Sequence, residues 1–406
     1  MNKLTLSNEN LKDIAERLPV PQYDRKSVTP GIMHFGASAF HRAHQAKYLD
    51  DLMNEGKALD FGIIGVGIMK GFDERMRDAL KPQDCLYTLV AKDPFGSRDA
   101  RVVGSIVDYL YGPDDEERVL EKMASPEIKI VSLTITEGGY NFDQITGEFI
   151  ADNPDVIHDL NPANPPRTVF AYIYRALKLR KDRGVRPFTV MSCDNIQENG
   201  TVCKKAILAF AGLVGDEGQT RWIDSEVHFP SCMVDRITPR TTEEDIADIA
   251  FEYGVADNWP VVTEDFIQWV LTDDFGDGES TRPPYEDAGV LIVNDIIPYE
   301  LMKLRLLNAS HQGIAYFGHL MGYELVDEAV KDPLLREFLA AYMDREATPT
   351  LQPIPGVDFA LYKKTLLDRF SNAAIKDTVA RLAAEASDRI PKWLVPVIED
   401  RIAQGG

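Results

Sequence analysis

Cysteines are scarce in this 406-residue sequence, and the few present are not grouped. Its four cysteines (Cys85, Cys193, Cys203, Cys232) show no CxxC spacing, which argues against a disulfide framework or a zinc knuckle. No GxSxG elbow supports a serine hydrolase. The N-terminus has no signal-peptide apolar stretch, and no apolar run approaches the roughly 20 residues that span a bilayer. These absences predict a soluble, cytoplasmic protein.

Positive charge is also in short supply, because 44 Lys and Arg face 65 Asp and Glu, a net charge of -21. Nucleic acid and anionic membranes would repel such a chain, so neither is expected as a partner. A small neutral molecule would be indifferent to that charge. The oligomeric state is left open, and a monomer is compatible with the sequence.

The length of the sequence, and the change in its hydrophobic pattern after residue 218, predict two domains. Residues 1–218 alternate short apolar runs with amphipathic stretches, the pattern of a Rossmann-type, doubly wound α/β sheet. The strands expected there are 31–36, 61–69, 85–90, 101–107, 128–136 and 188–192, and a helix is expected over 39–53. Residues 219–406 are poor in such runs and carry long helical periods, including 298–319, which predicts a mainly α-helical second domain.

A degenerate glycine loop follows the first expected strand: H-F-G-A-S-A-F-H-R-A-H, residues 34–44. A dinucleotide pyrophosphate would lie at such a strand-to-helix turn, where backbone amides and the helix dipole receive the phosphates. Ser38 occupies the place of the second glycine. An ordinary strand-to-helix turn explains these residues equally well.

An acid follows the second expected strand, where Gly65-Val66-Gly67 leads to Asp73. A carboxylate at this place can accept hydrogen bonds from the adenosine ribose and repel a 2′-phosphate, which favours NAD over NADP. The alternative is one more solvated helix acid.

The strongest pattern is P-Y-E-L-M-K-L-R-L-L-N-A-S-H, residues 298–311. On an α-helix, Glu300, Lys303, Asn308 and His311 fall within one arc of about 140°. A lysine with a lowered pKa can take the hydroxyl proton during alcohol oxidation, and an amide beside it can stabilise the alkoxide. The competing explanation is a half-exposed amphipathic helix carrying a Glu–Lys pair.

Three further segments place polar groups beside buried strands. Asn195, in S-C-D-N, is a candidate second oxyanion donor, although Asp194 and Asn195 also suit an N-cap and turn. In T-I-T-E-G-G-Y the pair Gly138-Gly139 suits either close approach to a cofactor or a simple turn. In M-V-D-R-I-T-P, Asp235 and Arg236 suit either a substrate contact or a buried ion pair. No metal site is expected, because His41 and His44 are the only close histidine pair.

The order of these segments resembles the polyol-specific long-chain dehydrogenases, and within them most closely the mannitol 2-dehydrogenases. The matching segments run from about Pro21 to Ile398: FHRAHQAKYLDDLM, SPEIKIVSLTITEGGY, FTVMSCDN, MVDRITP, K-x(4)-N-x(2)-H and DRFSNAAIKD. The resemblance implies a metal-independent enzyme that transfers a hydride between NAD(H) and C2 of a polyol, interconverting D-mannitol and D-fructose.

The resemblance also implies roles for individual residues. Lys303 becomes the general base, Asn195 and Asn308 the oxyanion pair, His311 a substrate-orienting group and Glu300 a gate for proton exchange. Asp235, Arg381 and Arg389 match substrate-contacting positions. The positions that match the cofactor site are Gly36, Ser38, Phe40, His41, Arg42, Gly67, Asp73, Glu137 and Gly138.

Three departures from the family pattern bear on these expectations. Ser38 replaces a glycine, Phe72 replaces an acid before Asp73, and the chain stops at Gly406 where relatives continue, which suggests a truncated form. Two alternatives therefore remain. One is a fructuronate or tagaturonate reductase, for which Arg236 and Arg240 could bind the substrate carboxylate. The other is a truncated, non-catalytic nucleotide-binding protein.

Overall fold

The computed structural model describes residues 3–143, 146–277 and 280–405, and the chain forms two compact units. The first comprises residues 1–90, 100–262 and 267–294, and the second comprises 91–99, 263–266 and 295–406. The sequence places the domain boundary after residue 218. The first unit extends beyond it because the strands Cys232–Asp235, Gln268–Thr272 and Leu291–Val293 also belong to it. Gly406, the last residue of the second expected domain, lies outside the described residues.

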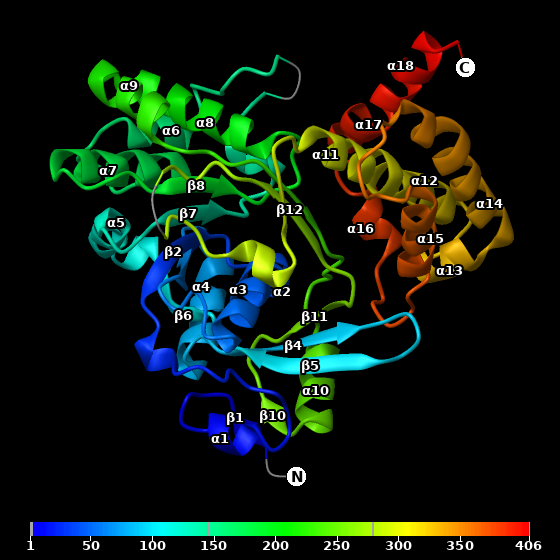
Figure 1. Ribbon diagram of the computed structural model, residues 1–406, viewed down its shortest axis with the longest axis horizontal. Coiled ribbons are helices and arrows are strands. Elements are labelled where there is room, and N and C mark those ends of the chain that lie inside the picture. Colours follow the sequence, from blue (N-terminus) through cyan, green and yellow to red (C-terminus); the bar gives the residue numbers. More distant parts are fainter. Residues whose placement is uncertain (1–2, 144–145, 278–279, 406) are drawn as a thin grey trace. The chain divides into compact units, whose positions relative to one another are not determined.

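A five-stranded parallel sheet forms the centre of the first unit (Figure 1), in the order β6-β3-β2-β7-β8. The strands are β2 (Pro30–Phe35), β3 (Gly62–Gly67), β6 (Ile106–Tyr111), β7 (Ile130–Leu133) and β8 (Thr189–Ser192). The order reverses direction at β2, between β3 and β7. In such a sheet, ligands bind outside the carboxyl ends of the strands near the reversal.

Both faces of this sheet are buried, which explains why its strands are apolar runs without alternation. Neighbouring residues of β2 point into different cores: Ile32 packs with one helix layer and Met33 with the other. The first layer is α2 (Ala39–Ala43), α3 (Gln45–Asn54) and α4 (Phe72–Leu80). The second is α5 (Glu116–Ala124), α6 (Pro154–Asp159), α7 (Val169–Asp182), α8 (Asn199–Val214) and α9 (Glu217–Glu226).

Three smaller sheets complete the strands. The antiparallel pair β9–β12 continues into β13, parallel to β12. A second sheet has the order β11-β4-β5, and a third joins β1 to β10. Their bounds are β1 (Leu4–Thr5), β4 (Tyr87–Lys92), β5 (Arg98–Val103), β9 (Cys232–Asp235), β10 (Val255–Ala256), β11 (Val261–Glu264), β12 (Gln268–Thr272) and β13 (Leu291–Val293). Two helices accompany them, α1 (Leu11–Ile14) and α10 (Glu243–Glu252).

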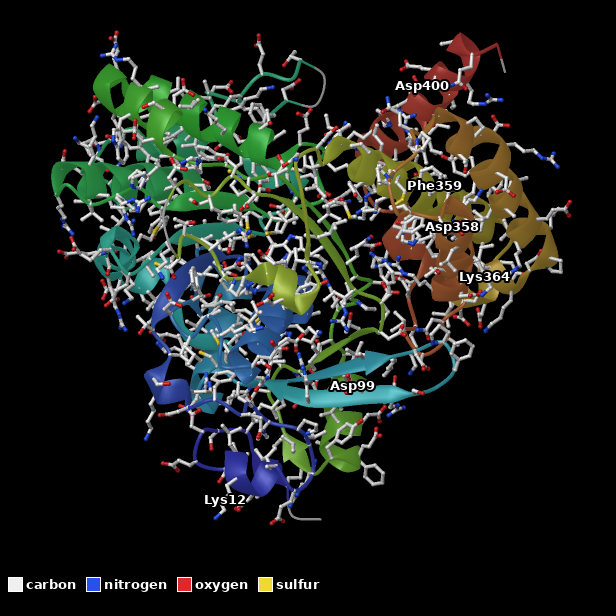
Figure 2. The ribbon with its side chains drawn as sticks, in the orientation of Figure 1. Lys12, Asp99, Asp358, Phe359, Lys364 and Asp400 are labelled. Atoms are coloured by element: carbon white, nitrogen blue, oxygen red, sulfur yellow. The ribbon has the colours of Figure 1, made fainter. Side chains whose placement is uncertain are left out.

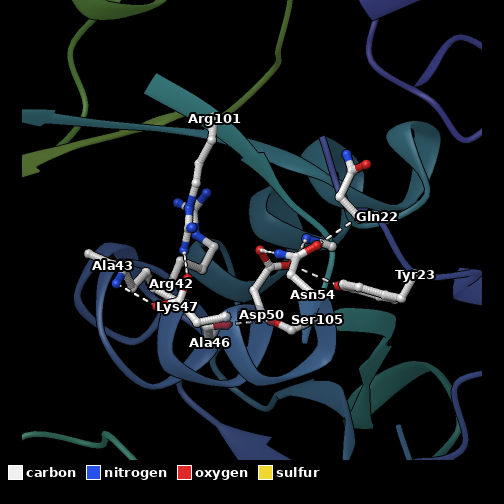
Figure 3. Close-up of polar contacts among 12 residues, drawn as sticks. Gln22, Tyr23, Arg42, Ala43, Ala46, Lys47, Asp50, Asn54, Arg101 and Ser105 are labelled. Atoms are coloured by element: carbon white, nitrogen blue, oxygen red, sulfur yellow. Dashed lines mark hydrogen bonds and ion pairs between the residues drawn. The ribbon is translucent and has the colours of Figure 1, made fainter. Parts of the chain in front are cut away.

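Asp50 anchors α3 inside the first unit (Figure 3). Its fully buried carboxylate accepts hydrogen bonds from the Tyr23 hydroxyl at 2.7 Å, the Gly104 amide at 2.9 Å and the Asn54 side chain at 3.0 Å. Burial raises the pKa of Asp50, and these donors oppose that rise. The cluster fixes α3, the helix that follows α2.

The second unit is helical, and α12 lies at its centre, packed against α13, α14 and α16. Its helices are α11 (Ile297–Lys303), α12 (Ala309–Leu320), α13 (Val326–Lys331), α14 (Pro333–Ala341), α15 (Phe359–Phe370), α16 (Val379–Ala383), α17 (Ala386–Trp393) and α18 (Val395–Ala403). Two π turns, Leu304–Asn308 and Tyr342–Ala347, continue α11 and α14. No helix in the described ranges is long and apolar enough to cross a membrane.

Three expected elements differ from the structure. The strand expected at 101–107 is wrong, because Gly104 and Ser105 separate β5 from β6, which belong to different sheets. The helix expected over 39–53 breaks at His44, whose φ of −118° and ψ of −90° are not helical. The helix expected over 298–319 is interrupted by the first π turn.

Candidate active site

The turn after β2 requires glycine at its first position. Gly36 has a φ of +89°, and a Cβ there would lie 2.1 Å from the Thr134 carbonyl oxygen. Ser38 has a φ of −72°, which any residue adopts, and it begins α2 without a side-chain cap. The replacement of glycine by Ser38 therefore costs no backbone strain.

The side chains that follow this turn point into the protein. The His41 ring stacks on His34 with centroids 3.5 Å apart, and Phe40 stacks on His44 at 5.1 Å. Arg42 is fully buried, donates to the Trp259 carbonyl and lies 5.1 Å from the centre of the Tyr87 ring. Burial also lowers the pKa of His41 well below its usual value. Both His41 and Arg42 thus lie among the residues that hold α2 in place.

Asp73 organises the loop that follows β3. Its Oδ2 accepts hydrogen bonds from the amides of Ile68 at 2.8 Å and Met69 at 2.7 Å. A Cβ on Gly67 would lie 2.5 Å from the Asp73 Cβ, so glycine permits this close packing. Burial raises the pKa of Asp73, while the two amides favour its charged form. Asp73 therefore lies at the start of α4, just after the loop that follows β3, and its contact with a ribose stays a prediction.

Asp194 joins the loops that follow β7 and β8. It accepts hydrogen bonds from the amides of Ile135 at 3.0 Å and Thr136 at 2.8 Å, and from the Tyr140 hydroxyl at 2.7 Å. Thr136 has a φ of +65°, an unfavourable conformation for a β-branched residue that these bonds hold. Burial raises the pKa of Asp194 to about 6. The next residue is the half-buried Asn195.

The same loop carries two expected cofactor positions. Glu137 is half-buried at the start of the short helix Glu137–Tyr140, and Gly138 is exposed. A Cβ on Gly138 would meet no atom within 4 Å. The backbone there is open to a bound molecule.

Asp235 ends β9 and is buried, paired in register with Gln268 of β12. Its neighbour Arg236 donates to the Ala43 carbonyl at 2.6 Å. His44 Nε2 also lies 2.8 Å from the Gln268 carbonyl oxygen. The strand that carries Asp235 is thus tied to the corner between α2 and α3.

Glu300, Lys303, Asn308 and His311 are all buried in the second unit, with exposed fractions of 3%, 6%, 6% and 7%. The alternative of a half-exposed amphipathic helix is therefore wrong. Asn308 Oδ1 and His311 Nε2 have no hydrogen-bond partner in the described part of the chain. These two atoms lie on the helix face that also carries Glu300 and Lys303, and a polar ligand there would give both of them a partner.

Cations surround His311. Burial lowers the pKa of His311 well below its usual value, and the charges of Arg381, Arg369 and Lys303 lower it further. The His311 ring is therefore neutral near pH 7, and one ring nitrogen can accept a hydrogen bond.

Each of the nearby arginines has a carboxylate partner. Arg381 pairs with Asp377, and Arg389 pairs with Glu385 at 3.1 Å. Arg389 also donates to the carbonyls at the end of α16, those of Arg381 and Leu382.

Sequence reasoning missed the buried pair of Arg369 and Glu264. Arg369 Nη2 and Nε lie 2.7 and 2.9 Å from the two Glu264 carboxylate oxygens, and both side chains are at most 3% exposed. Arg369 belongs to the DRFSNAAIKD segment, which was the only signal. Asn372 of the same segment donates to the Lys92 carbonyl at 3.0 Å.

Two surface cavities of about 420 and 620 Å³ lie elsewhere, along the β6 edge of the central sheet. They share Arg25, Val107 and Asp108, and no predicted site residue lines either of them. Over the ranges that the structure describes, no three His, Cys, Asp or Glu side chains come together as a metal site would require.

Comparison with known families is decisive. The mannitol dehydrogenase Rossmann domain matches residues 30–282, and the mannitol dehydrogenase C-terminal domain matches residues 295–406. The chain belongs to the mannitol dehydrogenase family. This confirms the resemblance seen in the sequence, and it confirms the fold class of a Rossmann-type domain with a helical C-terminal domain.

Individual members of the family are similar over nearly the whole chain. Mannitol 2-dehydrogenase of Phaeosphaeria nodorum is 47% identical, covering 99% of this chain and 70% of that protein. The Pseudomonas fluorescens mannitol 2-dehydrogenase, solved with NAD and D-mannitol, is 46% identical with a TM-score of 0.93, covering 99% and 81%. A D-sorbitol dehydrogenase structure is 40% identical with a TM-score of 0.90, covering 98% and 82%.

Proposed function

We propose that this chain is an NAD-dependent polyol dehydrogenase that oxidises D-mannitol at C2 to D-fructose. The observation that carries the proposal is the buried set of Lys303, Asn308 and His311, in which two polar atoms lack a protein partner. A hydroxylated substrate would supply partners for both atoms. The similarity to a mannitol 2-dehydrogenase solved with NAD and D-mannitol supports the choice of substrate and cofactor.

In this proposal the lysine moves the proton. Lys303 takes the proton of the C2 hydroxyl, and the amides of Asn308 and Asn195 stabilise the alkoxide oxygen as it gains charge. The neutral His311 ring orients the polyol, and the buried Glu300 passes the proton towards solvent. Asp235, Arg381 and Arg389 are proposed to contact the remaining hydroxyls.

The first unit suits a dinucleotide. The turn at Gly36, the Asp73 carboxylate after β3 and the open backbone at Gly138 all lie where strands of the parallel sheet end. Bound NAD⁺ would supply the acceptor of the hydride from C2. The side chains of His41 and Arg42 are assigned to holding this turn, and Ser38, Phe40, Gly67 and Glu137 remain predicted cofactor positions.

The charges around His311 favour a neutral polyol over a sugar acid. A uronate reductase needs a cation to bind the substrate carboxylate. Around His311, Arg369, Arg381 and Arg389 are each already paired with a carboxylate of the protein. Binding a sugar acid there would place a further negative charge beside Glu264, Asp377 or Glu385.

The test is nicotinamide absorbance at 340 nm with the purified chain and a panel of substrates. Mannitol with NAD⁺, and fructose with NADH, should turn over. Sorbitol, the C2 epimer of mannitol, should be slower, and NADP⁺ should be a poor replacement for NAD⁺. Turnover of fructuronate alone would move the assignment to the uronate reductases. No turnover combined with intact NADH binding would favour the non-catalytic alternative. A cytoplasmic location and a monomeric state of this enzyme remain predictions.

A further inference from the structure

The helix that carries Lys303 and His311 changes its hydrogen-bond register between them. Leu304 at the end of α11 donates to Glu300, as in an α-helix. After the π turn Leu304–Asn308, the Ala309 amide donates to the Leu304 carbonyl, five residues back. Single π turns inside α-helices are rare and occur often at functional sites.

This register change moves the candidate catalytic residues onto a narrower face. A π turn holds about one residue more than an α turn, so the residues after it are set back by about 100° around the axis. An uninterrupted α-helix would spread Glu300, Lys303, Asn308 and His311 over about 140°, and the π turn reduces this arc to about 80°. The burial of all four side chains agrees with the narrower face.

The segment that begins at Tyr342 contacts the π turn Leu304–Asn308. The hydroxyl of Tyr342 donates to the Arg305 carbonyl at 3.1 Å, and Tyr342 itself opens the other π turn, Tyr342–Ala347. The Arg305 guanidinium donates to the Thr350 carbonyl at 3.1 Å and to the Asp400 carboxylate at 2.6 Å. Asp400, labelled in Figure 2, belongs to α18.

Apolar contacts support the same segment. Leu304, the first residue of the turn, and Ala309, which follows it, pack with Trp393 and against Tyr342. Burial raises the pKa of the Tyr342 hydroxyl, so it remains a hydrogen-bond donor throughout the working pH range.

We infer that Tyr342 is a positioning residue: its hydroxyl holds the π turn that aligns Lys303 with Asn308 for proton transfer. The inference rests on the proposed function, which makes Lys303 the base and Asn308 a donor to the alkoxide. Tyr342 itself contacts neither substrate nor cofactor in this proposal. A displacement of about 1 Å in the reacting groups can cost up to about 100-fold in rate, so one hydroxyl at this turn is enough to matter.

The experiment compares Tyr342→Phe with Tyr323→Phe in the full chain. The control removes the Tyr323 hydroxyl, which belongs to the same unit. This hydroxyl donates to Asp332 at 2.8 Å, and neither residue belongs to a π turn. We expect kcat for mannitol oxidation to fall about tenfold in Tyr342→Phe, with KM changing less than about twofold. The apparent pKa of its pH–kcat profile should move, and the control should resemble the wild type in every respect.

Hydrogen exchange followed by mass spectrometry gives a readout that does not depend on activity. Amides 304–309 should exchange faster in Tyr342→Phe than in the wild type or the control. If Tyr342→Phe matches Tyr323→Phe in kcat, pH profile or exchange, the positioning role is overturned. Absence of polyol turnover in the wild type would instead sink the proposed function, and the exchange comparison would still decide whether Tyr342 holds the turn.

Discussion

The imidazole of His311 packs against the ring of Phe370, with centroids 4.8 Å apart. Burial and the surrounding cations hold the pKa of His311 well below its usual value, so this ring is neutral near pH 7. A histidine that does not titrate between pH 6 and 9 can orient a substrate but cannot produce a pH-dependent limb in that range.

His311→Gln is therefore expected to raise KM for mannitol, because an orienting hydrogen bond is lost, and to leave the apparent pKa of the pH–rate profile in place. Steady-state kinetics from pH 6 to 9 measure both quantities. Disappearance of the basic limb in this variant would show that His311, and not Lys303, is the general base.

Lys303→Ala should lower kcat by about 100- to 10,000-fold, the range typical of a lost general base. NADH affinity, measured by fluorescence titration, should stay within about twofold of the wild type. The control is Lys364→Ala, which removes a lysine of the same unit, labelled in Figure 2. Its side chain is 74% exposed. Near-normal turnover of Lys303→Ala would refute its role as base.

Much of the fold could be predicted because parallel strands buried on both faces are continuous apolar runs. The runs at β2, β3, β7 and β8 were found for that reason. The strand at 101–107 was predicted wrongly, since nothing in its composition shows that Gly104 marks a change of sheet. There the chain turns beside Pro21 and Arg25, which lie some 80 residues earlier.

Only the part of the candidate site that depends on helical spacing could be predicted from the sequence. Helical spacing alone places Lys303, Asn308 and His311 on one face. The π turn that narrows this face could not be predicted, because Leu304, Leu306 and Leu307 would be apolar in an α-helix as well. Contacts distant in sequence were also out of reach. Asp194 suited an N-cap, yet its partners belong to the loop after β7.

Asp194 predicts a specific pH dependence of stability. Burial raises the pKa of Asp194 from 3.8 to about 6, so the folded protein holds this proton more tightly than the unfolded chain. Stability from this group is present below about pH 4 and is lost as pH rises to about 6, by up to about 3 kcal/mol.

The variant Asp194→Asn lacks this titration. The difference in free energy of unfolding between the wild type and Asp194→Asn, measured by urea denaturation, should therefore change across pH 4 to 6 in the direction that disfavours the wild type at the higher pH. A difference that stays constant over this range would mean that Asp194 ionises normally.

The ion pair of Glu264 and Arg369 should behave as a buried unit. Glu264→Gln leaves the Arg369 guanidinium inside the protein without its charge partner, which costs about 3–5 kcal/mol of stability. Adding Arg369→Met to that variant should recover part of the loss, because the uncompensated charge is then gone. A double-mutant cycle from urea denaturation measures the coupling between the two residues.

The exposed pair of Arg183 and Glu121 is the matched control, since it has the same 2.7 Å contact but exposed fractions of 43% and 51%. Water screens both of its charges, so the cycle on Arg183→Met and Glu121→Gln should give no more than about 1 kcal/mol. Equal coupling energies for the two pairs would contradict the expected effect of burial. A large coupling energy for Glu264 and Arg369 alone would show that Glu264 holds the Arg369 charge, one of those that lower the pKa of His311.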